Sequence, residues 1–217
     1  MKSDLNDKIS RSKSVLKQAL DNWSEKLAVL CNFGNECVVT IHLIREMCGE
    51  ANVPLIFIDH GQHFPEVYEF KEKLSNLWDL QVISIKPKKE YDEVKEDKKE
   101  CCYWLKTEPF QRAVNENQLK AVCISTHPDA DDSSESVEKR EDEKFYRIYP
   151  LLDWSENEIW RYIRINKLPY CSLYDKGYKT LNCKNCSEQL MNFDDELKEE
   201  KVDKNDIVNR LQKLGYF

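Results

Sequence analysis

Four of the nine cysteines occur in two groups whose spacing could support metal chemistry. Cys183 and Cys186 form a CxxC motif, and Cys101 and Cys102 are adjacent in the middle of the chain. A CxxC motif can be half of a zinc site, a redox dithiol or half of an iron–sulfur site. Adjacent cysteine side chains diverge, and a four-iron cluster tolerates this divergence better than one small metal ion does. The spacing therefore favours a metal centre, with a cluster ahead of zinc.

The remaining cysteines are expected to be unpaired thiols. A reducing cytosol disfavours disulfides, and an odd cysteine count suits a disulfide framework poorly. We therefore expect Cys48, Cys123 and Cys171 to be buried small apolar residues, which is the usual role of an unpaired cysteine. Cys31 and Cys37 lie beside a glycine turn, where either could serve as a nucleophilic thiol, although burial is the commoner role.

Short apolar runs alternate with helical patterns along most of the chain. The runs are rich in Val, Ile or Leu, which is typical of buried strands in a parallel sheet. The expected strands are residues 27–31, 53–58, 82–85 and 121–125. The expected amphipathic helices are residues 5–23, 36–48 and 65–78. This alternation predicts an α/β protein with a doubly wound, mostly parallel sheet, in which ligands bind at the carboxyl ends of the strands.

Two loops that follow expected strands contain a glycine and could bind an anion. Gly34 lies in the first loop, before the helix at 36–48, and Gly61 lies in the second. Backbone N–H groups at such a turn form an anion site together with the helix N-terminus, and an ordinary glycine turn is the alternative. In the second loop, His60 and His63 could contact phosphate or ribose, and Asp59 could orient a ribose or cap the next turn.

The second half of the chain is more polar. Residues 129–143 contain eight acids and two bases without a helical period, which predicts a mobile loop. An extended segment is expected over 145–152, followed by a helix that Ser155 caps, with Glu158 completing a capping box. We divide the chain into an α/β domain at 1–190, which holds the cysteine site, and a charged helical tail at 191–217.

Short motifs occur in a specific order from about residue 12 to residue 187. They are Phe33-Gly34-x-Glu36, Ile58-Asp59-x-Gly61-x-His63-Phe64-Pro65-Glu66, Cys101-Cys102-x-x-x-Lys106-x-x-Pro109, Tyr149-Pro150-Leu151-x-Asp153-Trp154, Trp160-x-Tyr162-Ile163, Leu168-Pro169-Tyr170, Gly177-Tyr178 and Cys183-x-x-Cys186. No single motif is decisive, but their order and spacing together resemble the adenylyl-sulfate and phosphoadenylyl-sulfate reductase family.

The resemblance implies an adenine nucleotide α-hydrolase-like fold and an enzyme that reduces a sulfonucleotide to sulfite and an adenine nucleotide. It also implies a [4Fe–4S] cluster, with Lys106 near the cluster and the substrate sulfate. The implied cluster ligands are Cys101, Cys102, Cys183 and Cys186. The residues that would bind the nucleotide are Asn32, Phe33, Gly34, Asp59, Gly61 and His63. A thioredoxin-like thiol donor would be the redox partner.

The sequence departs from the family pattern at its reactive groups. The family uses a nucleophilic cysteine in a C-terminal Glu-Cys-Gly segment, and no cysteine follows Cys186 here. Cys31 or Cys37 would then be the replacement thiol, because the reaction needs a thiolate at the substrate. Residues 125–129 also lack the arginine with which the family meets its anionic substrate, and Leu105 replaces a basic residue.

Two further hypotheses come from other functional classes. A sulfur-inserting ligase would carry a Ser-Gly-Gly-x-Asp-Ser loop for pyrophosphate, and residues 32–37 lack that glycine pair. A non-catalytic paralogue would keep the fold and the cluster as a nucleotide-binding subunit, and the absence of the C-terminal cysteine supports this hypothesis.

The charge balance bears on partners. There are 40 acidic and 33 basic residues, and the net charge of −7 offers no general attraction to nucleic acid or to an anionic membrane. No stretch approaches the roughly 20 apolar residues of a membrane span, and the N-terminus lacks the apolar core of a signal peptide. We expect a cytoplasmic protein that binds neither membrane nor nucleic acid and that could form a homo-oligomer.

Overall fold

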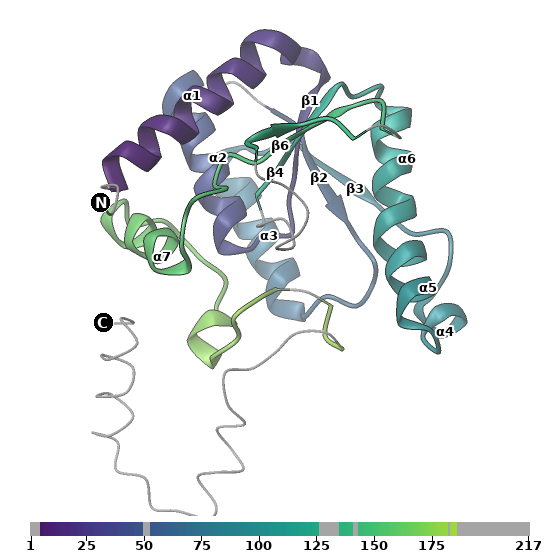
Figure 1. Cartoon of the computed structure of the whole chain (residues 1–217). Helices are drawn as coiled ribbons and strands as arrows, with labels where there is room; N and C mark the ends of the chain where they lie inside the picture. Colours follow the sequence, from purple (N-terminus) through teal and green to yellow (C-terminus); the bar gives the residue numbers. More distant parts are fainter. Residues whose placement is uncertain (1–4, 50–52, 126–134, 141–142, 182, 186–217) are drawn as a thin grey trace, which may run out of the picture.

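A six-stranded sheet forms the centre of the protein (Figure 1). The computed structural model describes residues 5–49, 53–125, 135–140, 143–181 and 183–185. The strands are β1 (Leu27–Leu30), β2 (Leu55–Ile58), β3 (Val82–Ile85), β4 (Ala121–Ile124), β5 (Val137–Glu138) and β6 (Tyr146–Ile148). Their order in the sheet is β3-β2-β1-β4-β6-β5. All pairings are parallel except that of β5 with β6, as the predicted fold class requires.

Helices cover both faces of the sheet, which is the doubly wound arrangement (Figure 1). The helices are α1 (Leu5–Trp23), α2 (Asn35–Cys48), α3 (Pro65–Trp78), α4 (Tyr91–Val94), α5 (Lys98–Cys102), α6 (Glu108–Glu116) and α7 (Glu156–Ile165). The first three and α7 pack on one face, and α6 packs on the other. Within the described ranges, no helix is both long and apolar enough to cross a membrane.

Alternate residues of each central strand face opposite sides of the sheet, because side chains in a strand alternate with a period of two. In β1, Leu27 and Val29 join the core beneath α1 and α2, whereas Ala28 joins the smaller core beneath α6. A strand covered on both faces must be apolar at every position. This explains why the strands could be predicted as unbroken apolar runs.

The sheet has a switch point between β1 and β4. The chain adds β2 and then β3 on one side of β1, and afterwards crosses over to place β4 on the other side. The connecting loops therefore leave β1 and β4 in opposite directions and open a crevice at the carboxyl ends of these strands. The two glycine-containing loops predicted to bind an anion begin at this edge.

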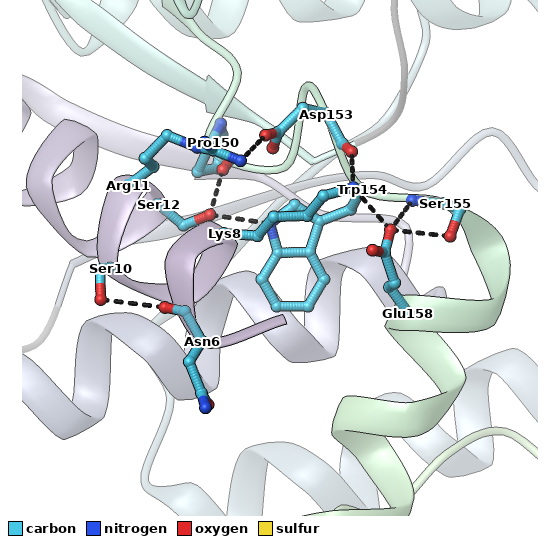
Figure 2. A network of polar contacts seen from close by, with 10 residues as sticks. All are labelled: Asn6, Lys8, Ser10, Arg11, Ser12, Pro150, Asp153, Trp154, Ser155 and Glu158. Atoms are coloured by element: carbon cyan, nitrogen blue, oxygen red, sulfur yellow. Dashed lines mark hydrogen bonds and ion pairs between the residues drawn. The ribbon is translucent and has the colours of Figure 1, made fainter. Parts of the chain in front are cut away.

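Hydrogen bonds and ion pairs connect the N-terminal helix α1 to residues 150–158 (Figure 2). Ser12 Oγ donates to Pro150 O at 2.6 Å and accepts from Trp154 Nε1 at 2.9 Å. Lys8 donates to the Asp153 carbonyl and to Glu158 Oε2. Ser12 and Trp154 are buried, so both partners of the tryptophan hydrogen bond are shielded from water. The network joins residues about 140 positions apart in sequence.

The expected elements are largely confirmed, with one correction. Helix α7 begins after Ser155, whose hydroxyl and N–H both contact Glu158 Oε2 at 2.7 Å, as the predicted capping box requires. The expectation of an unstructured run over 129–143 is wrong at Val137–Glu138, which pairs with β6 as an edge strand. Backbone hydrogen bonds with β6 stabilise this short strand although the surrounding segment is polar. Residues 126–134 lie outside the described residues, as does the predicted helical tail.

We predict that Ser12→Ala lowers the free energy of unfolding by about 1–3 kcal/mol, because it leaves the buried Trp154 N–H and Pro150 carbonyl without their partner. Urea unfolding at equilibrium measures this loss. The matched control is Ser10→Ala on the exposed face of the same helix, where the hydroxyl contacts only the Asn6 carbonyl. Equal losses for the two variants would contradict the proposed role of the network.

A second prediction concerns the contribution of Glu158 to stability at acidic pH. Burial acts to raise the pKa of Glu158, but hydrogen bonds from Lys8 and Ser155 outweigh it and lower the pKa to about 2. A carboxyl group with a lowered pKa stabilises the fold above its ordinary pKa of 4.5, and the contribution is lost as the pH falls toward 2.

Glu158→Gln should therefore destabilise the protein by about 1.5–3 kcal/mol at neutral pH and by progressively less on acidification. Unfolding measured from pH 7 to pH 2 tests this expectation, with Glu156→Gln in the same helical turn as the control. A difference between wild type and Glu158→Gln that stays constant with pH would refute it.

Candidate functional site

A cavity of about 320 Å³ lies at the switch point of the sheet. Its volume is in the lower part of the range for small-molecule sites. Residues just beyond β1 and β2 line it, together with residues from the helical segment before α6 and from β6. The lining side chains that can form polar contacts are Cys31, Asn32, His60, His63, Lys106, Thr107 and Arg147.

The first loop is held by its own hydrogen bonds. Gly34 N donates to Asn32 Oδ1 at 2.9 Å, and Asn35 N donates to the Tyr174 hydroxyl at 3.1 Å. A Cβ at Gly34 would lie 3.0 Å from Asn32 Oδ1 and 3.3 Å from the Tyr174 oxygen, which explains the glycine. A nucleotide phosphate would have to displace these acceptors to reach the same N–H groups.

Cys31 and Cys37 form a disulfide across this loop. Cys31 directly follows β1, Cys37 lies in the first turn of α2, and the turn brings their Cα atoms to 5.6 Å, a distance typical of disulfides. The expectation that the chain contains no disulfide is therefore wrong for this pair. The expectation of burial is confirmed, because the two residues are 2% and 1% exposed.

The second loop presents two stacked histidines. The imidazole centroids of His60 and His63 are 3.8 Å apart, and Gly61 between them adopts a φ of 71°, which favours glycine. His63 Nε2 lies 2.9 Å from Ile58 O, and Gln62 N donates to His60 Nδ1, so the His60 proton is on Nε2.

Burial sets the charge of these histidines. It lowers the pKa of His60 to about 3, with contributions from His63 and Lys106, and it also lowers the pKa of His63. Both imidazoles are therefore neutral near pH 7. They can bind a ligand through hydrogen bonds but contribute no positive charge.

The other predicted residues of these loops shape the site without lining it. Phe33 is fully buried and packs edge-to-face on Phe57, so it is not exposed at the loop surface. Asp59 accepts a hydrogen bond from the Tyr68 hydroxyl at 2.6 Å. Of the predicted nucleotide-binding residues, Asn32 and His63 reach the cavity.

Two cationic side chains share the cavity, and sequence reasoning missed one of them. Lys106, which was predicted, belongs to a π-helical turn at Tyr103–Thr107 between α5 and α6. Such turns are rare and occur frequently at functional sites. Arg147 comes from β6, donates to both Glu143 carboxylate oxygens and lies over Phe145. Its only signal in the sequence was an arginine in a short apolar strand.

Three buried polar atoms near the carboxyl edge of the sheet have no hydrogen-bond partner in the described part of the chain. They are Asn35 Oδ1, His63 Nδ1 and Ser125 Oγ. Asn35 opens α2 after β1, His63 belongs to the loop after β2, and Ser125 directly follows β4. Buried polar groups are nearly always paired, so orphaned atoms that share one edge of the sheet are consistent with a polar ligand there.

The predicted cluster cysteines lie on two segments that approach this region. Cys101 and Cys102 end α5, one turn before Lys106, and both are half-buried. Cys183 is buried, and the backbone N–H of its neighbour Lys184 donates to Gln62 O in the second loop at 2.8 Å. Leu181 and Lys106 both line the cavity, so both segments reach it.

Three of the four predicted cluster cysteines, Cys101, Cys102 and Cys183, lie in the described residues. Thiolates are the preferred ligands of iron–sulfur clusters. Cys186 lies outside the described residues, and among those described, no three or more Cys, His, Asp or Glu side chains gather closely enough to hold a metal ion. The donor chemistry therefore fits a cluster, whereas the described geometry contains no assembled set of ligands.

Comparison with known proteins identifies related chains. Residues 26–189 match the model of the phosphoadenosine phosphosulfate reductase domain. Adenosine 5′-phosphosulfate reductase 1 of Bacillus subtilis is 30% identical over 194 residues, which cover 84% of this chain and 82% of the relative.

Solved structures show the same fold at lower identity. The phosphoadenylyl-sulfate reductase of Candida auris matches with a TM-score of 0.72 at 24% identity, covering 87% of this chain and 98% of that one. Candida glabrata FMN adenylyltransferase matches with a TM-score of 0.67, also at 24% identity, covering 83% of this chain and 64% of that one. These likenesses confirm the predicted adenine nucleotide α-hydrolase-like fold.

Proposed function

Because this chain belongs to the phosphoadenosine phosphosulfate reductase domain family, we propose that it is a sulfonucleotide reductase that converts adenylyl-sulfate, or its 3′-phosphorylated form, to sulfite and an adenine nucleotide. The observation that carries this proposal is the cavity at the switch point, where Lys106 and Arg147 share one space with two neutral histidines. A sulfur-inserting ligase is not favoured, because the matching family model and the curated relatives are sulfonucleotide reductases.

The polar surroundings of the cavity suit a nucleoside. Neutral His63 offers Nδ1 as an acceptor, and Ser125 offers a hydroxyl. Adenine carries an amino donor and ribose carries hydroxyl groups, so a bound nucleoside would supply partners that these buried atoms lack. Asn32 and the backbone of the first loop would contact the same nucleotide.

The phosphosulfate group requires positive charge, which the chain as a whole does not offer. Lys106 and Arg147 would supply it locally, and charge-assisted hydrogen bonds are about twice as strong as neutral ones. Arg147 is already bound to Glu143, so part of its charge is neutralised. Lys106 is therefore the main candidate to hold the sulfate end, and Cys31, which lines the same cavity, is the candidate nucleophile.

We further propose that Cys101, Cys102, Cys183 and Cys186 bind a [4Fe–4S] cluster. The support is the chemistry of the four thiols, of which Cys101, Cys102 and Cys183 lie on two described segments that contribute Lys106 and Leu181 to the cavity lining. When bound, the cluster would supply an electrostatic field at the sulfate and need not change its oxidation state. A cytoplasmic location, a thioredoxin-like thiol donor and a homo-oligomer remain predictions, as does the division of the chain at residue 190.

Lys106→Gln should lower the rate of sulfite release by about tenfold to a hundredfold, because it removes a charge-assisted contact with the phosphosulfate. The assay compares adenylyl-sulfate with its 3′-phosphorylated form, with a dithiol as reductant. The control is Lys73→Gln on the exposed side of α3, which changes the net charge equally. Equal activity of the two variants would refute the assigned role of Lys106, and no sulfite from wild type would refute the reductase function.

Anaerobically purified protein should contain iron and acid-labile sulfide in equal amounts, and Cys183→Ser should lose most of both. The physical reason is that removal of one thiolate opens the cluster to loss. Elemental and sulfide analysis measures this, with Cys48→Ser, a half-buried cysteine at the end of α2, as the control. Stoichiometric zinc without sulfide would overturn the cluster.

A further inference from the structure

We propose that Cys31 and Cys37 are the redox pair of the reaction: Cys31 attacks the sulfate sulfur, and Cys37 then releases sulfite by forming the disulfide that the structure contains. This inference rests on the proposed reductase function and deepens it. Cys31 is then the nucleophile, Cys37 is the resolving thiol, and the disulfide is the oxidised form that a reductant must reduce before the next turnover.

The placement of the two sulfurs divides their roles. Cys31 directly follows β1 and lines the cavity together with Lys106 and Arg147. Cys37 lies in the first turn of α2, is 1% exposed and is not among the residues that line the cavity. A substrate in the cavity therefore meets Cys31 first, and Cys37 contacts the intermediate through Cys31.

The local charges favour a thiolate at Cys31. The Phe33 N–H donates to Cys31 Sγ at 3.3 Å, and two cations share the cavity with this sulfur. Hydrogen-bond donors and nearby cations stabilise a thiolate. The N-terminus of α2 favours negative charge at Cys37, but Glu36 in the same turn opposes it. Cys31 is therefore the better nucleophile of the pair.

The other described cysteines outside the proposed cluster are poorer candidates. Cys123 lies in the interior of β4, where burial raises the pKa of its thiol to about 12. Burial also raises the pKa of the Cys171 thiol, which donates to the Glu66 carbonyl. Cys48 lies at the far end of α2 from the loop. Among the described cysteines, only Cys31 lines the cavity.

The two steps balance in atoms and electrons. The Cys31 thiolate attacks the sulfate sulfur, an S–S bond forms, and the bond from that sulfur to the nucleotide phosphate oxygen breaks, so that the nucleotide leaves with the electron pair. The Cys37 thiolate then attacks Cys31 Sγ, and sulfite leaves with the electrons of the broken S–S bond. Two thiols are oxidised to one disulfide while sulfur(VI) is reduced to sulfur(IV). A dithiol protein of the thioredoxin class restores the pair by exchange.

A single turnover tests this directly. The anaerobically purified full chain is reduced with excess dithiol, freed of that dithiol and mixed with radiolabelled adenylyl-sulfate or its 3′-phosphorylated form. We expect one sulfite per chain without any added thiol. The tryptic peptide of residues 27–45, which contains both cysteines, should become lighter by two hydrogens as sulfite appears.

The cysteine variants separate the two roles. Cys37→Ser should accumulate a covalent SO₃ adduct on Cys31 and release sulfite only when a dithiol is added. Cys31→Ser should lose sulfite release by at least about a hundredfold while still binding the nucleotide. Cys48→Ser should behave as wild type. Because the adduct is a gain of signal, a folding defect in one variant cannot imitate it.

Two different failures can be told apart. If sulfite appears only with an added thiol while the 27–45 peptide stays reduced, or if Cys31→Ser keeps full activity, the redox pair is overturned and the reductase function stands. If neither sulfonucleotide yields sulfite from wild type even with excess dithiol, the reductase function is overturned and the redox pair with it.

Discussion

The parallel pairing of β1 with both β2 and β4 is the constraint on which the rest of the structure depends. It buries the three strands on both faces, so none of them can carry a polar side chain at an interior position. The first positions at which these three strands can present a reactive group are therefore the residues directly beyond their carboxyl ends. Those positions hold Cys31, Asp59 and Ser125, and all three meet at one edge of the sheet. The cavity is a direct consequence of this pairing.

The charged side chains that line the cavity are opposite in sign to the net charge of the chain. The net charge is −7, yet the cavity contains Lys106 and Arg147 and no carboxylate among its lining residues in the described part of the chain. Burial keeps His60 and His63 neutral, so the imidazoles contribute hydrogen bonds while the two cations supply the positive charge. Selectivity for an anion therefore depends on where the few cations lie rather than on how many acids surround them.

The sequence was sufficient where structure depends on local pattern. Apolar runs and helical periods predicted β1 to β4 and the helices α1 to α3, and the Ser155–Glu158 spacing predicted the start of α7. Arg147 could not be predicted, because its access to the cavity depends on β6 pairing with β4 after a long connection. The Cys31–Cys37 disulfide was missed because an argument from cellular redox conditions took precedence over a spacing that one tight turn can close.

The contact between α1 and residues 150–158 has a consequence for synthesis on the ribosome. Ser12 and Trp154 are 142 positions apart, so at about 5–20 residues per second α1 emerges roughly 7–30 seconds before the tryptophan that its serine binds. During that interval the helix can be held only by the elements made soon after it, chiefly α2. The nascent chain therefore leaves its first helix incompletely anchored until the family motif around Trp154 emerges, and Leu5 and Leu16 of this helix reach their final burial only then.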